Sequence, residues 1–229
     1  MTRAIIESQE PVTLVGGGHA TPADLFEALT LAPTCVAADG GATLALDNGI
    51  LPEAVIGDFD SLDPETLARI PPPRQHRIAE QDSTDFDKAL RHIAAPLVIA
   101  VGFAGGRVDH QLAALHTLMV RAARPVVLLA ETEIVLLAPP RLDLPTQAGD
   151  VVSLFPLGPV TGRSRGLEWP IEGIDFAPGG RSGTSNRAMG DVTLELNAPA
   201  MLLILPRRLI QPVVARLLLP DAARWHARA

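Results

Sequence analysis

Aspartates gather in four segments; two of these directly follow short apolar runs, and a third contains a glycine-rich turn. The segments are Asp39-Gly40-Gly41, Gly57-Asp58-Phe59-Asp60-Ser61, Gln81 to Lys88 with Asp82, Asp85 and Asp87, and Gly105-Gly106-Arg107-Val108-Asp109. Carboxylates that meet in one place repel one another unless a cation lies among them. Oxygen ligands without a Cys or His cluster suit Mg²⁺, which proteins hold with one or two carboxylates, waters and substrate phosphates. The pattern therefore predicts a site for a Mg²⁺-bound polyphosphate.

Several of these aspartates also fit local structural tasks. Thr84 followed by Asp87 resembles a helix-capping box, and Asp63 before Pro64 suits a turn or a cap. For Asp58 and Asp60, the alternate spacing in one loop lets both side chains reach one ion, so we favour a functional interpretation for that pair.

Lys88 is the only lysine among the 19 basic residues. A compact ammonium approaches a phosphate as a point charge where a planar guanidinium does not fit. An ion pair with Asp85, three residues earlier on the same helix face, is the structural alternative. We favour a phosphate contact.

Glycine-rich turns at Gly16-Gly17-Gly18 and Gly105-Gly106 let backbone approach a phosphate, but neither has a Walker A or a Gly-x-Gly-x-x-Gly pattern. His19 and His110 in the same loops are interpreted as hydrogen-bonding residues rather than bases. Cys35 lies in an apolar run and is expected to be a buried thiol without a chemical role.

Short apolar runs alternate with helix-like stretches through the first 130 residues. The predicted strands are 11–15, 35–38, 54–56, 97–101 and 125–130, with helices opening at Thr21-Pro22 and spanning Ala42 to Asn48. This alternation predicts an α/β fold, a three-layer, Rossmann-like parallel sheet with helices on both faces. Because the carboxyl ends of parallel strands share one edge, the aspartates that follow them should converge there.

Beyond residue 130 the chain changes to short apolar runs separated by Gly, Pro and Asp. The runs are 134–137, 151–155, 192–196 and 201–205, which predict an antiparallel β-domain. We place the domains at 1–130 and 131–229, with 139–149 as a possible linker. The end of the chain, 209–229, is interpreted as a docked helix in preference to an amphipathic tail.

The composition excludes several classes of protein. The 229 residues are 47% apolar and 20% charged, which excludes disordered and fibrous chains. A net charge of −7 argues against nucleic acid as a partner, and the first 130 residues, with 16 acidic and 9 basic residues, carry the whole imbalance. No apolar run is long enough for a membrane span and no signal peptide is recognised, so we expect a cytoplasmic protein.

Taken in order, the four acidic motifs resemble those of thiamine pyrophosphokinases. Gly166-Leu167-Glu168-Trp169-Pro170-Ile171 and Gly183-Thr184-Ser185-Asn186 look like the thiamine-binding segments of that family. The resemblance covers roughly residues 11–205. It implies an α/β catalytic domain, a C-terminal β-sandwich, and a homodimer with thiamine sites at the subunit interface.

The same resemblance implies individual site residues. Metal ligands would be Asp58, Asp60, Asp85 and Asp109; Asp39, Gly40, Gln81, Lys88, Arg107 and Asp109 would hold ATP; Trp169, Ser185 and Asn186 would hold thiamine. Asp58, Asp60, Asp85, Asp109 and Lys88 would form the catalytic set. Two positions depart from the family pattern. Arg187 stands where relatives often have an acid, and its role is left open. Trp169 replaces a common tyrosine, with packing in a β-core as its structural alternative.

The activity that the resemblance implies is Mg²⁺-dependent transfer of the diphosphoryl group of ATP to the hydroxyl of thiamine, giving thiamine diphosphate and AMP. One alternative is the same chemistry on another alcohol, such as a hydroxymethylpterin. The others are a non-catalytic nucleotide-binding regulator and a metal phosphoesterase that uses water.

Overall fold

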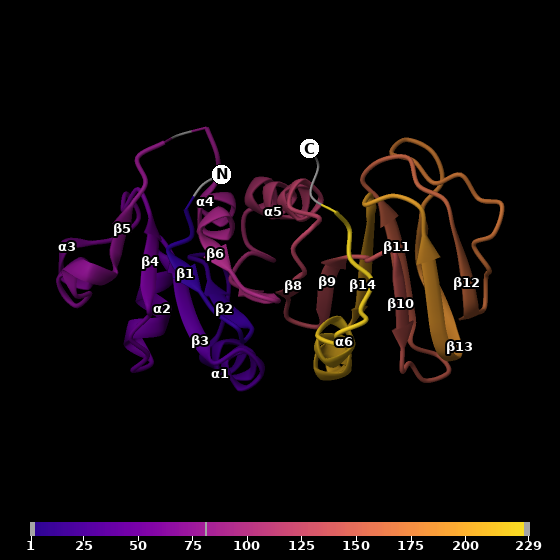
Figure 1. Cartoon of the computed structure of the whole chain (residues 1–229), viewed down its shortest axis with the longest axis horizontal. Helices are drawn as coiled ribbons and strands as arrows, with labels where there is room; N and C mark the ends of the chain where they lie inside the picture. The colour runs from indigo at the N-terminus through magenta and orange to yellow at the C-terminus, as the bar shows by residue number, and fades with distance from the viewer. Residues whose placement is uncertain (1–2, 81, 227–229) are drawn as a thin grey trace. The chain divides into compact units, whose positions relative to one another are not determined.

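A computed structural model of the chain describes residues 3–80 and 82–226 (Figure 1). Contacts divide it into two units. The N-terminal unit holds the residues up to Thr117 together with Leu128–Glu131, and the C-terminal unit holds Leu118–Val127 and the residues from Thr132 onward. Strand β8 (Val126–Leu129) contributes residues to both. None of the helices in the described ranges combines the length and the apolar character that a membrane span needs.

A parallel sheet forms the centre of the N-terminal unit. Its strands are β2 (Val12–Val15), β3 (Thr34–Ala38), β4 (Ala54–Gly57), β5 (Gln75–Arg77) and β7 (Val98–Val101). The pairings β2–β7, β3–β4 and β4–β5 are parallel, and β2 lies beside β3. Because β2, β4 and β7 are buried along their whole length, they read as continuous apolar runs in the sequence. The predicted parallel sheet is confirmed.

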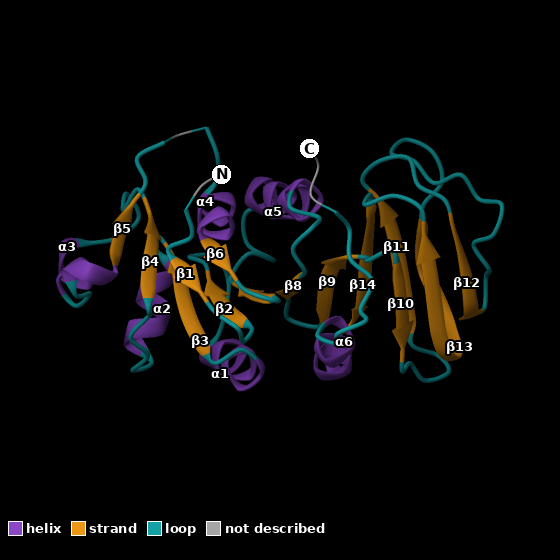
Figure 2. Ribbon diagram, viewed as in Figure 1, coloured by secondary structure: helices purple, strands orange, loops and turns teal. Residues whose placement is uncertain are grey.

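Helices lie on both faces of this sheet. The helices of this part of the chain are α1 (Pro22–Leu31), α2 (Gly41–Asp47), α3 (Pro64–Ala68), α4 (Asp85–His92) and α5 (Val108–Val120), whose last residues, from Leu118, belong to the C-terminal unit; α1, α2 and α4 contact the strands. Leu25 of α1 and Ala45 of α2 pack with Val15 and Cys35 of the strands, whereas α4 contacts β3 and β4. In Figure 2, α1 and α2 lie on one side of these strands and α4 lies on the other. The three-layer arrangement is thus the predicted one.

Local capping explains where the helices begin. Thr21 and Asp24 form a reciprocal capping box at α1, and the Asp63 carboxylate accepts from the backbone N of Thr66 at 2.8 Å to start α3. The Thr84 hydroxyl accepts from the backbone N of Asp87 at 3.3 Å and starts α4. Capping is therefore a real function of Asp63, as predicted.

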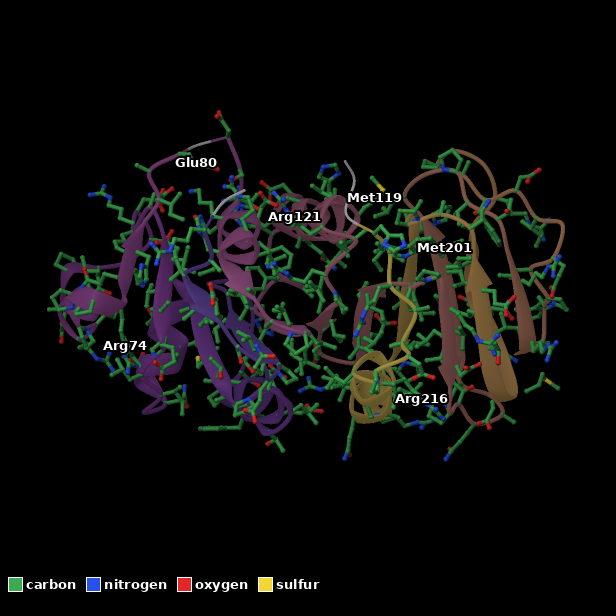
Figure 3. All side chains as sticks on the ribbon, viewed as in Figure 1. Arg74, Glu80, Met119, Arg121, Met201 and Arg216 are labelled. Atoms are coloured by element: carbon green, nitrogen blue, oxygen red, sulfur yellow. The ribbon has the colours of Figure 1, made fainter. Side chains whose placement is uncertain are left out.

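Some short elements were not predicted. Strands β1 (Ile6–Glu7) and β6 (Ile93–Ala94) pair in parallel, and the 3-10 helix η1 (Pro72–Arg74) precedes β5. Arg74, labelled in Figure 3, donates from Nη1 to the carbonyl oxygens of Leu51 and Pro52, at 3.3 and 2.9 Å. These bonds tie η1 to the turn before β4.

The C-terminal unit consists of antiparallel strands and one helix. The strands are β9 (Glu133–Leu137), β10 (Arg141–Leu144), β11 (Val151–Pro156), β12 (Gly162–Leu167), β13 (Gly183–Leu196) and β14 (Met201–Pro206). Strand β13 is 14 residues long and serves two sheets, since its first part pairs with β11 and its later part with β10 and β12. The predicted antiparallel β-domain is confirmed.

The linker predicted at 139–149 is wrong, whereas the docked helix predicted near the end of the chain is present. Residues 139–149 are not a linker, because they contain β10, whose Leu142 and Leu144 are buried against β13. After the short helix η2 (Arg207–Leu209), helix α6 (Ile210–Leu217) buries Ile210, Val213 and Val214, so the docked helix is confirmed there.

Gly41 at the start of α2 offers a test of this packing. A Cβ at Gly41 would lie 2.1 Å from the carbonyl oxygen of Val15 in β2. We expect Gly41→Ala to lower the free energy of unfolding by about 3 kcal/mol, because backbone must shift to relieve the overlap. Urea unfolding measures this. The matched control is Gly180→Ala, whose Cβ would meet its nearest atom at an ordinary 3.4 Å. Equal unfolding midpoints for the two variants would contradict the packing described.

Candidate active site

A cleft of about 880 Å³ opens in the N-terminal unit where β2, β3, β4 and β7 end. Glycine backbone, carboxylates and one lysine line much of it: Gly17, Gly18, Asp39, Asp58, Asp60 and Lys88. The carboxyl edge of the sheet is thus hollowed as the parallel topology predicts.

Three carboxylates meet in this cleft. Asp39, Asp58 and Asp60 each offer an oxygen within 4.8 Å of the others. Asp39 is 2% exposed, and its Oδ2 accepts from the backbone N of Ser61 at 3.2 Å. Its Oδ1 is buried and has no hydrogen-bond partner within the described part of the chain. Burial is the main cause that raises the pKa of Asp39, with Asp85 adding to it against the hydrogen bonds from Ser61.

A buried carboxylate oxygen without a partner is what a bound cation would satisfy. Together with the other two carboxylates, Asp39 supplies a hard-oxygen donor set of the kind that Mg²⁺ prefers. The residues present therefore fit the predicted metal, with Asp39 among the ligand candidates.

Tight backbone geometry brings these carboxylates together. A Cβ at Gly57 would lie 2.8 Å from the Cβ of Asp39, so only glycine lets the ends of β3 and β4 approach this closely. Asp39 and Phe59 have positive φ angles of 43° and 66°. The Asp58 carboxylate accepts from the backbone N of Asp60 at 3.3 Å, which closes the turn.

Lys88 is buried between two carboxylates. It is 2% exposed, and its Nζ donates to Asp58 Oδ2 at 2.8 Å and to Asp85 Oδ1 at 3.0 Å. Burial alone would lower the pKa of Lys88, but the hydrogen bonds to Asp58 and Asp85 outweigh it and the pKa is raised. Lys88 is therefore a charged group inside the site, and its ion pair with Asp85 is not a surface feature.

Arg107 and Asp109 lie apart from the carboxylate group. Both are exposed, and Arg107 donates to Asp109 from Nε at 3.2 Å and from Nη2 at 2.6 Å. The hydrogen bond from Arg107 is the main cause that lowers the pKa of Asp109 to about 2. Arg107 lines the cleft, so its guanidinium stands at the edge of the site.

Of the predicted aspartates, Asp39, Asp58 and Asp60 converge directly, Asp85 joins them through Lys88, and Asp109 is bonded to Arg107. Gly40 lines the cleft. Gln81 lies outside the described residues.

Sequence reasoning missed the aromatic part of the cleft. The rings of Phe86 and Phe103 have centroids 4.3 Å apart and both line it. Phe103 lies between Gly102 and Ala104 in the turn after β7, where a large aromatic side chain in a glycine-rich turn was the available signal. His19 and His110 also line the cleft.

The predicted thiamine residues lie in the C-terminal unit. Trp169 is 53% exposed, so packing in a β-core is the wrong interpretation for its side chain. Ser185 is exposed, with a φ of 61°, and Asn186 is buried. The Asn186 amide hydrogen-bonds the backbone of Trp169.

Cys35 is inert, as predicted. It is buried, and this burial, with a smaller contribution from Glu53, raises the pKa of its thiol to about 12. A thiol that stays protonated is a poor nucleophile and metal ligand.

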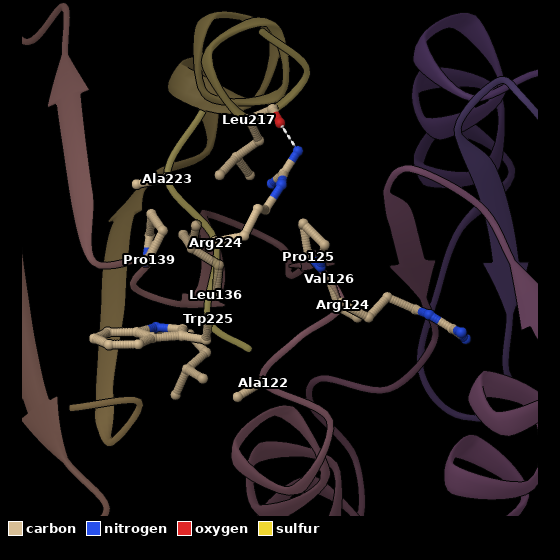
Figure 4. A pocket seen from close by; sticks show the side chains of 11 residues that line it. Ala122, Arg124, Pro125, Val126, Leu136, Pro139, Leu217, Ala223, Arg224 and Trp225 are labelled. Atoms are coloured by element: carbon tan, nitrogen blue, oxygen red, sulfur yellow. Dashed lines mark hydrogen bonds between the residues drawn. The ribbon is translucent and has the colours of Figure 1, made fainter. Parts of the chain in front are cut away.

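A second cavity in the C-terminal unit is too small for a substrate (Figure 4). Its volume is about 20 Å³, room for about one water molecule. Arg224 donates across it to the carbonyl oxygen of Leu217, and Trp225 donates from Nε1 to the carbonyl oxygen of Ala138 at 2.9 Å.

Two family models match the chain. One, described as thiamin pyrophosphokinase, catalytic domain, matches residues 27–128. The other, described as thiamin pyrophosphokinase, vitamin B1 binding domain, matches residues 141–201. Together they cover more than half of the chain.

Curated relatives and solved structures agree with these matches. Thiamine pyrophosphokinase 1 of Arabidopsis thaliana is 27% identical over 162 residues, 62% of this chain and 61% of the relative. Thiamine pyrophosphokinase of Bacillus subtilis (strain 168) is 38% identical over 89 residues, 36% of this chain and 42% of the relative. The match therefore spans less than two thirds of the length of each.

Among solved structures, thiamin pyrophosphokinase from Candida albicans superposes with a TM-score of 0.74 at 16% identity, covering 89% of this chain and 96% of that one. At this identity the likeness concerns the fold, an α/β domain followed by an antiparallel β-domain.

Asp39→Asn should stabilise the metal-free protein at neutral pH by about 1–2 kcal/mol, because it removes a buried negative charge whose Oδ1 has no hydrogen-bond partner among the described residues. The folded-state pKa of Asp39 lies above 3.8, so the folded state binds its proton more tightly and stability falls as the pH rises from that value. The difference in the free energy of unfolding between the variant and the wild type should therefore increase as the pH rises. Urea unfolding in a chelator, at a series of pH values, measures it.

Asp63→Asn is the matched control, because the pKa of Asp63 is shifted in the opposite direction and the pH dependence of its stability contribution is reversed. The hydrogen bonds from Thr66 lower the pKa of Asp63, so its contribution is present above 3.8 and is lost as the pH falls. An Asp39→Asn protein less stable than wild type at every pH would show that Asp39 Oδ1 has a partner after all.

Proposed function

Because the chain belongs to the thiamine pyrophosphokinase family, we propose that it transfers the diphosphoryl group of ATP to the hydroxyl of thiamine, giving thiamine diphosphate and AMP. The observation that carries this proposal is the cleft in which Asp39, Asp58 and Asp60 meet beside buried Lys88. We assign ATP binding and catalysis to residues 1–130 and thiamine binding to residues 131–229.

Mg²⁺ would be held by Asp39, Asp58 and Asp60, whose oxygens lie together in the cleft. When bound, it would supply positive charge that neutralises the charge that develops on the phosphates during transfer. Asp85 and Asp109 stay proposed as further ligands. Each is bonded to a cation of the chain, Asp85 to Lys88 and Asp109 to Arg107, which would have to be shared or exchanged.

Backbone and cations on the walls of the cleft suit the polyphosphate. Gly17, Gly18 and Gly40 line the cleft and have no side chain, so phosphate oxygens can approach the backbone closely at these residues. Exposed Arg107 and buried Lys88 add fixed positive charge. Gln81 is also proposed as an ATP contact.

In this reaction the protein itself forms no covalent bond to the transferred group. The hydroxyl oxygen of thiamine forms a bond to the β-phosphorus, and the bond from that phosphorus to the oxygen bridging to the α-phosphorus breaks, so AMP leaves. The hydroxyl proton passes to a carboxylate of the cluster. Positioning and charge stabilisation by the cleft residues supply most of the catalysis.

Thiamine would be held by the C-terminal unit. The exposed indole of Trp169 offers a face for stacking, and Ser185 lies in β13, the next strand along the chain. The match of the vitamin B1 binding model to residues 141–201 favours thiamine over a hydroxymethylpterin and over a non-catalytic regulator. The homodimer with interface sites and the cytoplasmic location stay predictions.

Incubation with ATP and Mg²⁺, with and without thiamine, tests this function. We expect AMP and thiamine diphosphate in equal amounts, only when thiamine is present, because the alcohol is the acceptor. Chromatography of nucleotides and thiamine esters measures both products. Phosphate release without thiamine would mean hydrolysis, and AMP formation with a hydroxymethylpterin but not with thiamine would mean another acceptor.

Asp60→Ala should lower kcat/KM by about a thousandfold, because one metal-binding carboxylate is lost. The fold should survive, because the hydrogen bond that the Asp60 side chain makes among the described residues is the one it accepts from Ser61 Oγ at 2.9 Å. The matched control is Asp47→Ala, an exposed carboxylate whose partner is Arg69. Steady-state kinetics and the unfolding midpoint are measured for both variants. Normal turnover in Asp60→Ala would rule out its part in metal binding.

A further inference from the structure

Asn186 makes an unusual set of hydrogen bonds for a residue beside a predicted ligand site. It is 5% exposed and lies in β13, where it is the register partner of Val152 in β11. Its side chain reaches the segment that follows β12. Oδ1 accepts from the backbone N of Trp169 at 3.2 Å and from that of Arg187 at 2.8 Å, and Nδ2 donates to the carbonyl oxygen of Trp169 at 2.7 Å.

These partners fix the orientation of the amide and use its acceptor capacity. A carboxamide oxygen has two lone pairs, and both are taken by backbone N–H groups. The NH₂ group faces a backbone carbonyl, so exchanging O and N would break every bond. Asn186 therefore has no acceptor left for a ligand, and its burial leaves little access to the remaining N–H.

The side-chain amide of Asn186 replaces a backbone hydrogen-bonded pair beyond the end of the β12–β13 ladder. Their register pairs end at Leu167 and Ala188, followed by a bond from the backbone N of Glu168 to the carbonyl oxygen of Arg187 at 2.8 Å. At Asn186 the register partner of β13 is in β11, not in β12. The side chain of Asn186 therefore makes the link between β13 and Trp169, the second residue after β12. One side chain thus holds both the N–H and the C=O of Trp169.

The held residue is an exposed aromatic. With its backbone fixed at both ends of the residue and its side chain 53% exposed, Trp169 has only its two side-chain torsions free. An indole presented in this way loses little entropy when a planar ring stacks on it.

We propose that Asn186 is a positioning residue, which fixes the backbone of Trp169 so that the indole meets the aromatic ring of thiamine, and is not itself a thiamine ligand. The inference rests on the proposed function. Ser185, the neighbouring member of the predicted pair, is held by its backbone N to Ser153 Oγ at 2.9 Å. Its hydroxyl has no hydrogen-bond partner among the residues described, so Ser185 is the member of the pair that can bind a ligand.

Kinetics of Asn186→Ala provide the first test. We expect KM for thiamine to rise by about tenfold, with KM for ATP and kcat within about twofold of wild type. A purely structural defect would reduce the amount of active protein, and so kcat, without changing either KM. The matched control is Asn197→Ala, in which Asn197 Oδ1 accepts from the backbone N of Thr161 at 2.9 Å near the start of β12. It should leave KM for thiamine unchanged.

Fluorescence of Trp169 provides the second test without any substrate. The chain has two tryptophans, so Trp225→Phe leaves Trp169 as the only emitter. In that background, Asn186→Ala should add a fast component to the anisotropy decay of Trp169, and Asn197→Ala should not. Asn186→Asp keeps both acceptor bonds but faces the Trp169 carbonyl without a donor, so a smaller effect is expected. Asn186→Asp replaces Asn186→Ala in both tests if the alanine variant does not fold.

The outcomes separate this inference from the function on which it rests. An active wild type with unchanged KM for thiamine in Asn186→Ala, or unchanged mobility of Trp169, overturns the positioning inference alone. A wild type that forms no AMP with thiamine overturns the proposed function and the inference with it. A raised thiamine KM together with a mobile Trp169 supports the inference.

Discussion

The arrangement of the cleft depends on how the chain keeps several negative charges together at the end of a sheet. Lys88, buried with its ammonium between Asp58 and Asp85, balances two of them. Asp39 is left with a buried oxygen that has no hydrogen-bond partner among the described residues. Like charges in a low-dielectric setting are costly without a countercharge, so the unbound protein carries an electrostatic cost that a bound cation would remove.

Backbone strain is concentrated at the candidate sites of both units. The non-glycine residues with positive φ in the described chain are Asp39, Phe59 and Ser185. Two of them shape the carboxylate turns, and the third lies beside Asn186. Such conformations cost roughly 1–3 kcal/mol each and persist only where surrounding structure holds them. Here the parallel sheet and the long strand β13 supply that support. The regular strands thus hold the strained residues of the candidate sites in place.

Prediction from the sequence worked best where the physical signal was local. Buried strands such as 12–15 and 98–101 read as apolar runs, and Thr21 marks its helix through a capping box. Residues 139–149 were misread as a possible linker, because β10 is only four residues long and lies between prolines. Strand β5, with the sequence Gln-His-Arg, has no apolar pattern at all and forms because β4 offers it a free edge.

The sequence by itself determined which chemical groups are available and their order: aspartates placed after strands, one lysine, glycines in the turns, and an aromatic followed by a Ser-Asn pair. Tertiary structure decided which of them meet. Asp109 bonds to Arg107, only two positions earlier in the sequence. Lys88, in contrast, contacts Asp58 across 30 positions, and Asn186 contacts Trp169 across 17. These two long-range pairings depend on strand register and on burial, which are properties of the folded chain, so no local pattern could specify them.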